Sequence, residues 1–332
     1  MRIRGLYFVA LWTLLLAPLA LGQSTFEKPK VHIAVGGKAA LYYLPLTIAE
    51  QLGYFKAEGL DVQISDFAGG SQALRAVVGG SADVVSGAYE HTINMQAKSQ
   101  MLQCFVQQGR APQIVIGIAT AKAKTYRSPR DLKRMKIGVS APGSSTNMVV
   151  NFFIARDGLK PSDVSIIGVG TGAGGIAAIK SGQIDAISNL DPMMTKLEQD
   201  GDIRVIADTR TLKGTEQLFG GPMPAGCLYA PIDYIRKYPN TIQALTNAIV
   251  RADKWIQMAS PQDVLKTVPE SYLLGDKALY LFSFNKVRES ISPDGSISDA
   301  GARTALKVLP TFNPEVNPKP ANTWDRQKAW VT

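Results

Sequence analysis

The hydrophobic positions of this chain change their period at two places, and each change predicts a strand followed by a helix. Residues 31–35 form a short apolar run that ends in two glycines, and apolar side chains then recur at helical spacing over residues 41–55. Residues 135–139 and 147–156 repeat this arrangement, with a turn rich in glycine and serine between them. Both halves of the chain are therefore expected to open with a strand, a glycine turn and a helix.

An internal repeat indicates that these halves are two lobes. Residues 61–87 reappear without a gap as residues 163–189, a shift of 102 residues (163 − 61), and eight of the 27 positions are identical, among them Asp83 and Asp185. The shift is too long for a solenoid unit, whose period is about 20–50 residues. Each copy predicts a strand, a helix and a strand, which is the unit of a parallel sheet. Chance similarity between such units is the alternative, but the identities fall on turn glycines and strand ends together, which favours two lobes with a cleft between them.

The other segments predict two crossings between the lobes and a helical return. An apolar strand over residues 114–119 and a Gly/Pro-rich connector over residues 219–226 are the expected crossing points, near Gly117 and Pro224. From about Tyr234 the pattern is helical, and these helices are expected to return and cover the first lobe. The predicted domains are a signal peptide (1–22), the first part of lobe 1 (23–118), lobe 2 (119–222), and the return of lobe 1 with C-terminal helices and a Pro-rich tail (223–332).

The first residues of the chain predict export. Arg2 and Arg4 precede an uncharged run over residues 6–21, and small residues stand before Gln23, as in a secretory signal peptide that is cleaved after Gly22. The mature chain would have 310 residues (332 − 22), a length that suits two domains of ordinary size. We therefore expect a soluble protein that is located, most simply, in the periplasm.

The formal net charge of +9 does not point to nucleic acid. Without Arg2 and Arg4 the charge is +7 (9 − 2), and the basic residues are scattered rather than clustered with aromatic ones, so no nucleic-acid partner is expected. A mild attraction for small anions or an anionic surface is the better interpretation. Cys104 and Cys227 both lie in apolar contexts, so buried free thiols are expected rather than a disulfide between them.

Six polar turns that follow predicted strands and precede helices are the candidate ligand site. Glycine lets a backbone approach a ligand closely, and Ser or Thr at a helix start caps the N–H groups or shares them with an anion. For one turn alone helix capping is the simpler explanation, but six equivalent turns favour a site in the cleft. Tyr42 and Tyr43 add aromatic candidates, and Glu90 and Asp191 add acidic ones. The turns are at residues 36–38, 69–72, 86–90, 143–146, 170–174 (which includes Gly172) and 189–192.

The sequence contains no known catalytic or metal-binding motif. Its two histidines, His32 and His91, are too far apart for a metal-binding helix motif. A phosphate-binding loop, a Gly-x-Ser-x-Gly elbow and cysteine pairs spaced for zinc are also missing from the sequence. His91 follows Tyr89 and Glu90 and is a further candidate for ligand contact. We therefore expect no catalytic residues, no metal ion and no cofactor.

Four short phrases carry a family resemblance. They are YYLP (residues 42–45), AEQLGYF (49–55), EGLDV (58–62) and GSADV (80–84). Together they resemble the nitrate/sulfonate/taurine and pyrimidine-precursor (thiamine-precursor) group of ABC-transporter substrate-binding proteins. The resemblance covers nearly all of the mature chain, most strongly residues 31–226. It implies an α/β type II periplasmic binding protein fold, in which two α/β lobes are joined by two crossing strands with the ligand cleft between them.

The resemblance also implies which residues bind the ligand. Ser144, Ser145 and Thr146 match the hydroxyl-rich helix start where family members hold an anionic group. Asn189 and Asp191 occupy the position where sulfonate binders often place an aromatic residue beside a proline, and the missing aromatic argues against taurine itself. The matching positions of the first lobe are Lys38, Tyr42, Gly70, Ser71, Gln72, Tyr89 and Glu90.

The expected function is capture of one small organic anion, a sulfonate or a carboxylate, and its delivery to an ABC permease with its ATPase subunits. The protein is expected to act as a monomer. It is not expected to be an enzyme, because the cysteine-rich motif of the related pyrimidine-synthesising enzymes is absent from the sequence. A binder of a pyrimidine-type thiamine precursor, and an exported sensor partner or enzyme on the same scaffold, are the alternatives left open.

Overall fold

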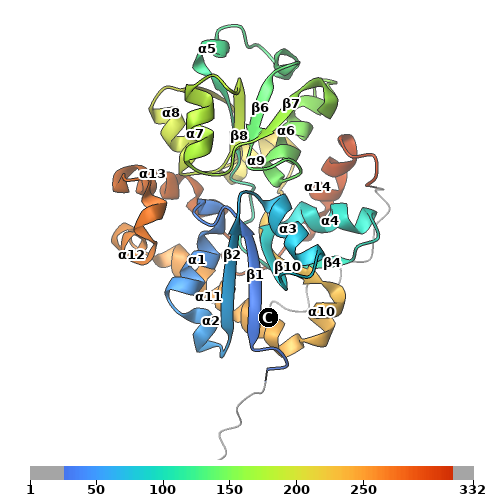
Figure 1. Ribbon diagram of the computed structural model, residues 1–332, viewed down its shortest axis with the longest axis vertical. Helices are drawn as coiled ribbons and strands as arrows, with labels where there is room; N and C mark the ends of the chain where they lie inside the picture. The colour runs from blue at the N-terminus through green and yellow to red at the C-terminus, as the bar shows by residue number, and fades with distance from the viewer. Residues whose placement is uncertain (1–25, 317–332) are drawn as a thin grey trace, which may run out of the picture.

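Two five-stranded sheets form the centres of two lobes, which Figure 1 shows one above the other. The computed structural model describes residues 26–316, so the predicted signal peptide and most of the Pro-rich tail lie outside the described residues. The first sheet has the order β2-β1-β3-β10-β4, with β1 (Lys30–Gly36), β2 (Asp61–Phe67), β3 (Val84–Ala88), β4 (Leu102–Gln107) and β10 (Gly226–Pro231). The second has the order β7-β6-β8-β5-β9, with β5 (Val115–Ala119), β6 (Lys136–Val139), β7 (Ser165–Gly168), β8 (Ala186–Asn189) and β9 (Ile203–Asp208).

The two sheets have the same pattern of strand pairing. In the first sheet, β1 pairs in parallel with β2 and β3, while β10 is antiparallel to β3 and β4. In the second, β6 pairs in parallel with β7 and β8, while β5 is antiparallel to β8 and β9. Each antiparallel strand directly follows a crossing, since β5 enters the second lobe and β10 returns to the first. The structure therefore has the two α/β lobes and the two crossings that the sequence predicts.

The crossings lie over residues 108–114 and 220–225. The second contains Pro224, as the Gly/Pro-rich connector predicts. The first differs from the prediction, because Gly117 lies inside β5, which pairs with β8 and β9 in the second lobe. The boundary expected between residues 118 and 119 therefore falls within a strand. A central strand that is buried on both faces is a continuous apolar run, and a crossing strand gives the same sequence signal.

The internal repeat corresponds to β2-α3-β3 in the first lobe and β7-α7-β8 in the second, where α3 is Gly70–Val78 and α7 is Ala173–Lys180. Asp83 and Asp185 explain one of its identities. The carboxylate of Asp83 accepts the N–H of His32 (3.0 Å), and that of Asp185 accepts the N–H of Lys136 (2.9 Å). In return, the N–H of each aspartate donates to the carbonyl of the same residue (2.8 Å in both lobes). The repeated aspartate thus fixes the start of β3 or β8 against its neighbouring strand.

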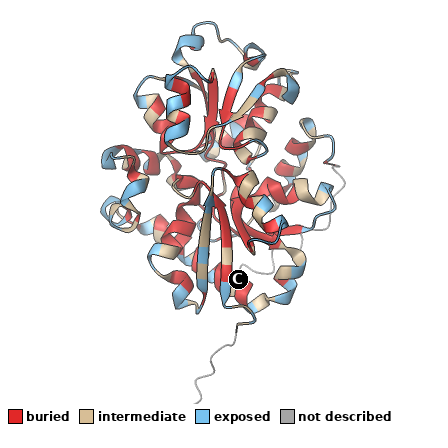
Figure 2. Cartoon of the chain, in the orientation of Figure 1, coloured by how far each residue is buried: buried red, intermediate tan, exposed pale blue. Residues whose placement is uncertain are grey.

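The longest C-terminal helix packs on the first lobe, while α13 (Lys277–Val287) and η6 (Leu309–Thr311) also contact helices of the second. Helix α11 (Pro239–Met258) packs against α1 (Leu44–Gln51), α2 (Tyr54–Ala57) and β4, and its buried face carries apolar residues at helical spacing. Figure 2 shows the buried residues concentrated on the inner strands of both lobes and on the helix faces turned toward them. The other helices are η1 (Leu41–Tyr43), α4 (Tyr89–Ala97), α5 (Thr120–Ala123), η2 (Pro129–Leu132), α6 (Ser145–Ala155), η3 (Pro161–Asp163), α8 (Met193–Gln199), α9 (Leu212–Phe219), α10 (Ile232–Lys237), α12 (Pro261–Thr267), η4 (Glu270–Leu273), α13 (Lys277–Val287), η5 (Arg288–Ser290), α14 (Asp299–Val308) and η6 (Leu309–Thr311).

Two single features of the described residues complete the fold. Cys104 on β4 and Cys227 on β10 are buried free thiols, as expected from their apolar contexts. Within residues 26–316, none of the helices has the length and the apolar character that a membrane span needs.

Candidate functional site: a cavity between the lobes

A small enclosed cavity lies between the lobes at the carboxyl ends of strands from both sheets. Gly36 and Ala88 end β1 and β3 of the first lobe, and Ser140 and Leu190 follow β6 and β8 of the second. Ligands of open α/β proteins bind at such strand ends. The cavity has a volume of about 10 Å³, which is room for about one water molecule. Its twelve lining residues are Gly36, Tyr42, Tyr43, Gly70, Ala88, His91, Ile114, Ser140, Ser144, Ser145, Thr146 and Leu190.

The structure brings together six of the fourteen predicted site residues in this wall. They come from the first lobe, at η1 and the start of α3, and from the second lobe, at the start of α6. These six are Tyr42, Tyr43, Gly70, Ser144, Ser145 and Thr146.

Ser71 and Glu90 lie beside the cavity and bond across the interface between the lobes. The N–H of Ser71 donates to Ser144 Oγ (3.0 Å), and Ser145 Oγ donates to the carboxylate of Glu90. All four residues belong to the predicted set. Because the lobes contact each other directly here, a ligand reaches the cavity only when the lobes separate.

The hydroxyl groups at the start of α6 do not act as ordinary helix caps. Ser144 occupies the N-cap position, but its hydroxyl makes no capping bond and pairs with Ser71 instead. Thr146 Oγ1 accepts the N–H of Ser140 (3.0 Å) and so holds the turn that follows β6. The first N–H groups of a helix have no acceptor within it, and the helix dipole favours an anion there. The start of α6 therefore offers the N–H groups of its first turn to the cavity, while the hydroxyls of Ser144 and Ser145 already donate to Ser71 and Glu90.

The cavity wall combines polar and apolar side chains and contains no lysine or arginine among its twelve residues. Burial lowers the pKa of the His91 ring to about 4, against the opposing effect of the Gly143 backbone, so the ring is neutral at pH 7. Burial raises the pKa of Glu90, although its bond from Ser145 acts to lower it. Across the described residues 26–316, no group of three or more His, Cys, Asp or Glu side chains is placed to hold a metal ion.

Two lining residues, Ile114 and Ser140, were missed by the sequence analysis, which reached the others through the predicted turns or as single candidates. Ser140 directly follows β6, and its place as a polar residue after a strand was an available signal. Ile114 lies in the first crossing, just before β5. Its apolar side chain looks like any other core residue, so the sequence offers no signal for it.

Other predicted residues lie outside the cavity wall and have partners of their own. Lys38 Nζ forms an ion pair with Glu50 (2.6 Å), and Asn189 Nδ2 donates to the carbonyl of Gly170 (2.8 Å). A ligand would have to compete with these partners, so the participation of Lys38 and Asn189 stays a prediction. The same holds for Gln72, Tyr89 and Gly172, which are also outside the wall.

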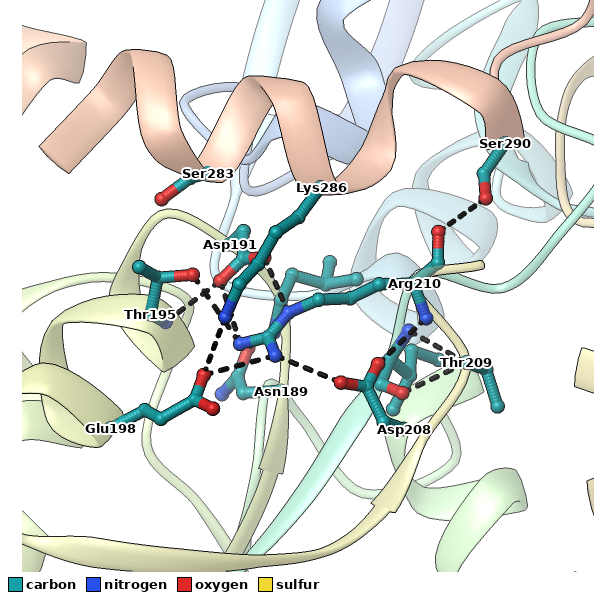
Figure 3. A network of polar contacts seen from close by, with 12 residues as sticks. Asn189, Asp191, Thr195, Glu198, Asp208, Thr209, Arg210, Ser283, Lys286 and Ser290 are labelled. Atoms are coloured by element: carbon teal, nitrogen blue, oxygen red, sulfur yellow. Dashed lines mark hydrogen bonds and ion pairs between the residues drawn. The ribbon is translucent and has the colours of Figure 1, made fainter. Parts of the chain in front are cut away.

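Asp191 is held by Arg210 and does not line the cavity. Figure 3 shows the guanidinium reaching Asp191 with two nitrogens, Nε to Oδ2 (2.7 Å) and Nη2 to Oδ1 (3.3 Å). The side chains of Arg210 and Asp191 are only 2% and 1% exposed, and Nη1 also pairs with Asp208 (2.9 Å) and Glu198 (3.1 Å). Burial acts to lower the pKa of Arg210, but the charges of Asp191 and Asp208 outweigh it and raise the pKa. The carbonyl of Asp191 accepts the N–H of Leu41 in the first lobe (2.9 Å), so this network supports one edge of the interface.

Comparisons with known proteins show a family match and several proteins of similar fold. The model of the NMT1-like family matches residues 25–268 of this chain. A protein of Bordetella bronchiseptica RB50 with a solved structure is 60% identical with a TM-score of 0.86, over 91% of this chain and 98% of that one. The alkanesulfonate-binding protein SsuA from Xanthomonas axonopodis pv. citri, solved with bound MOPS, is 20% identical with a TM-score of 0.65, over 89% of this chain and 96% of that one. YtlA of Bacillus subtilis (strain 168), which carries a provisional name as a binding protein, is 23% identical over 272 residues, 78% of this chain and 77% of that one.

The likeness to SsuA is a likeness of fold. It confirms the predicted fold class, since both chains have two α/β lobes over nearly their whole length. The match to the NMT1-like family model over residues 25–268 confirms the family resemblance that the four sequence phrases indicate.

Proposed function

The chain belongs to the NMT1-like family, and we propose that it is a periplasmic binding protein that captures a small organic anion of the sulfonate or carboxylate type. The proposal includes delivery of this anion to an ABC permease with its ATPase subunits, and action as a monomer. Two observations support it: the fold shared with the alkanesulfonate-binding protein SsuA, and a cavity formed by residues of both lobes.

The start of α6 is the observation that carries the anion proposal. Ser144, Ser145 and Thr146 line the cavity there, and the first N–H groups of the helix are donors. A bound anion would replace Ser71 and Glu90 as the acceptor for the hydroxyls of Ser144 and Ser145. A helix start favours an anion by about 0.3–1 kcal/mol when exposed and by up to about 2 kcal/mol when partly buried. Each hydrogen bond to a charged group contributes about 1.5–3 kcal/mol. Because the wall contains no lysine or arginine, these donors would hold the anion without a full positive charge.

Binding at this site would be coupled to closure of the lobes. Ser71 and Glu90 of the first lobe bond to Ser144 and Ser145 of the second. A ligand that contacts both lobes stabilises the closed form by the difference between its contacts in the closed and open forms. The same hydroxyl groups would thus serve both closure and recognition.

A pyrimidine-type ligand is the second candidate. The rings of Tyr42 and Tyr43 meet edge to face, with centroids 4.8 Å apart and an interplanar angle of 75°. Together with His91 they give the cavity an aromatic wall, against which a flat heterocycle can pack.

We infer that the chain does not act as an enzyme. Besides the phenols of Tyr42 and Tyr43, the titratable groups at or beside the cavity are His91 and Glu90, at the start of α4. The carboxylate of Glu90 accepts a bond from Ser145, and His91 Nδ1 is 3.0 Å from Tyr229 Oη. The shifted pKa values of Glu90 and His91 follow from burial, and no carboxylate, lysine, cysteine or second histidine lines the wall beside His91.

A ligand screen tests the proposed function. Thermal unfolding of the mature protein is measured with short sulfonates, short carboxylates, nitrate, bicarbonate and an aminopyrimidine. A ligand present at 100 times its Kd stabilises the folded state by about 2.7 kcal/mol, which gives a measurable rise in Tm. We expect an organic acid to raise the Tm. If no anion does so, the anion proposal is wrong, and a rise with the aminopyrimidine alone supports the second candidate.

The double variant Ser145→Ala/Thr146→Ala tests the position of the anion. Calorimetry with the best acid from the screen is expected to show a loss of affinity of about tenfold or more, because 1.4 kcal/mol corresponds to a factor of ten. The control Ser298→Ala removes a hydroxyl that caps α14 by accepting the N–H of Gly301 (3.1 Å), outside the cavity wall. It should cost about 1 kcal/mol of stability and leave affinity unchanged. Unchanged affinity in the folded double variant would move the anion to the Ser71 turn.

A further inference from the structure

Two buried polar atoms in the cavity wall have no hydrogen-bond partner. They are Tyr42 Oη and His91 Nε2, on residues that are 3% and 1% exposed. The Gly143 backbone interacts with the His91 ring and acts to raise its pKa, but no hydrogen bond of ordinary geometry reaches Nε2. About 90% or more of the buried polar groups in native proteins are hydrogen-bonded, so two unpaired atoms in one small cavity call for a specific explanation. Both residues come from the first lobe, whereas the hydroxyl donors of α6 come from the second.

The surroundings of His91 make Nε2 available as either a donor or an acceptor. Nδ1 is 3.0 Å from Tyr229 Oη, and a phenol hydroxyl can either donate to the ring or accept from it. Nε2 then carries the proton in one arrangement and accepts one in the other. The ring is neutral at pH 7, since burial lowers its pKa to about 4. A neutral ring beside a phenol matches an uncharged polar group better than a second negative charge.

We propose that the ligand carries, besides its anionic group, a neutral hydrogen-bonding group such as a hydroxyl or a carbonyl, which binds Tyr42 Oη and His91 Nε2. The inference rests on the proposed function and names the class of ligand as hydroxy- or oxo-substituted carboxylates or sulfonates. Such a ligand is larger than the space for about one water molecule in this closed form, so it requires a wider cleft, in which it reaches from the start of α6 in the second lobe to the aromatic wall of the first. A plain alkyl acid leaves both buried atoms unpaired, and this penalty selects against it.

The alternative is that one ordered water satisfies both atoms, because the cavity has room for about one water molecule. The two explanations predict a different dependence of affinity on a hydroxyl group of the ligand. If the water stays in place, the affinity does not depend on whether the ligand carries a hydroxyl group. A direct bond couples the ligand hydroxyl to Tyr42 and His91.

Matched ligand pairs test this coupling. Calorimetry compares lactate with propionate and 2-hydroxyethanesulfonate with ethanesulfonate, on the mature wild type and on Tyr42→Phe. For the pair that binds, we expect wild type to prefer the hydroxylated acid by about tenfold, the value of one good hydrogen bond. In Tyr42→Phe this preference should disappear, through weaker binding of the hydroxylated acid alone. The control Tyr280→Phe removes a buried phenol hydroxyl on α13, outside the cavity wall, and should keep the preference.

The two isosteric variants of His91 give an independent readout. His91→Asn keeps an amide near the Nδ1 position beside Tyr229 and removes Nε2, so it should lose the preference for the hydroxylated acid. His91→Gln places its amide near the Nε2 position and should retain part of that preference.

The outcomes separate the inference from the proposed function. If acids bind but Tyr42→Phe weakens both members of a pair equally, or neither, the inference is wrong and the anion proposal stands. The same conclusion follows if the plain acids bind as tightly as the hydroxylated ones. If none of the organic acids in the screen or in these pairs binds, the proposed function fails and the inference fails with it.

Discussion

The ion pair between Arg210 and Asp191 predicts a large loss of stability for Arg210→Met. The guanidinium reaches both carboxylate oxygens of Asp191, and neither side chain is more than 2% exposed. Methionine has a similar length but no charge, so the variant leaves the Asp191 carboxylate buried without an opposite charge, although the N–H of Thr195 still donates to it (2.8 Å). Removing one partner of a buried ion pair costs about 3–5 kcal/mol. Asp208 and Glu198, whose side chains are 40% and 36% exposed, are solvated after the change and add at most about 1 kcal/mol each.

Urea unfolding followed by circular dichroism measures this cost as the shift of the midpoint multiplied by the m-value. The matched control is Lys286→Met, which removes the ion pair of Lys286 with Glu198 (2.9 Å, 29% and 36% exposed) and should cost about 0–1 kcal/mol. Figure 3 shows Lys286 in the same network, at its more exposed side. The double variant Arg210→Met/Asp191→Leu should recover most of the loss, because it no longer buries an isolated charge.

The reasoning is refuted if Arg210→Met costs no more than Lys286→Met, or if removing Asp191 as well brings no recovery. Either result would mean that Asp191 is not a buried charge that depends on Arg210. The network also bears on ligand binding, because the carbonyl of Asp191 accepts the N–H of Leu41 across the interface (2.9 Å). We therefore expect Arg210→Met to weaken ligand binding even at temperatures where the variant is fully folded.

Two more predictions concern closure and pH. A Cβ at Gly37, which has a φ of +93°, would lie 2.3 Å from Thr171 Oγ1 of the other lobe. Gly37→Ala should therefore disfavour the closed form and weaken the ligand affinity measured by calorimetry by about tenfold. Unchanged affinity would contradict this. Asp253 is buried on α11, with no bond to either carboxylate oxygen, and burial and Asp294 raise its pKa. Because the folded pKa exceeds the unfolded one, wild type should lose about 1.4 kcal/mol of stability per pH unit between them. Asp253→Asn has no carboxyl to titrate, so its free energy of unfolding in urea should exceed that of the wild type by a margin that grows as the pH rises above about 4. The prediction is contradicted if the stabilities of the two proteins change with pH in parallel.

The repeat was readable from the sequence because its identities have a local cause. Asp83 and Asp185 each bind the backbone at the start of a neighbouring strand, and that contact needs the same residue in both lobes. The sequence could not show that β5 belongs to the second sheet, because a strand inside a sheet and a strand that crosses between lobes are both apolar runs. Only the pairing of β5 with β8 and β9 distinguishes them.

The candidate site was predicted less completely, for a similar reason. A polar residue after a strand is a site candidate by position, but its partner is decided by contacts that the local sequence does not encode. Lys38 pairs with Glu50, which is 12 residues away in the sequence, and Asp191 pairs with Arg210, which is 19 residues away. Ser144 and Ser145 instead find partners in the opposite lobe and lie in the cavity wall. Position at a strand end was therefore not sufficient for a place in the wall.

Equivalent positions of the two lobes bring different chemistry to the cavity. In each lobe the segment after the first strand lines the wall, as η1 with Tyr42 and Tyr43 after β1, and as the start of α6 after β6. The first contributes aromatic rings and an unpaired phenol hydroxyl, and the second contributes serine and threonine hydroxyls with backbone N–H groups. A ligand with one kind of group would be held mainly by one lobe and would gain little from closure. A ligand with an anionic end and a neutral polar end contacts both lobes, so the free energy of its recognition is also the free energy that closes the cleft.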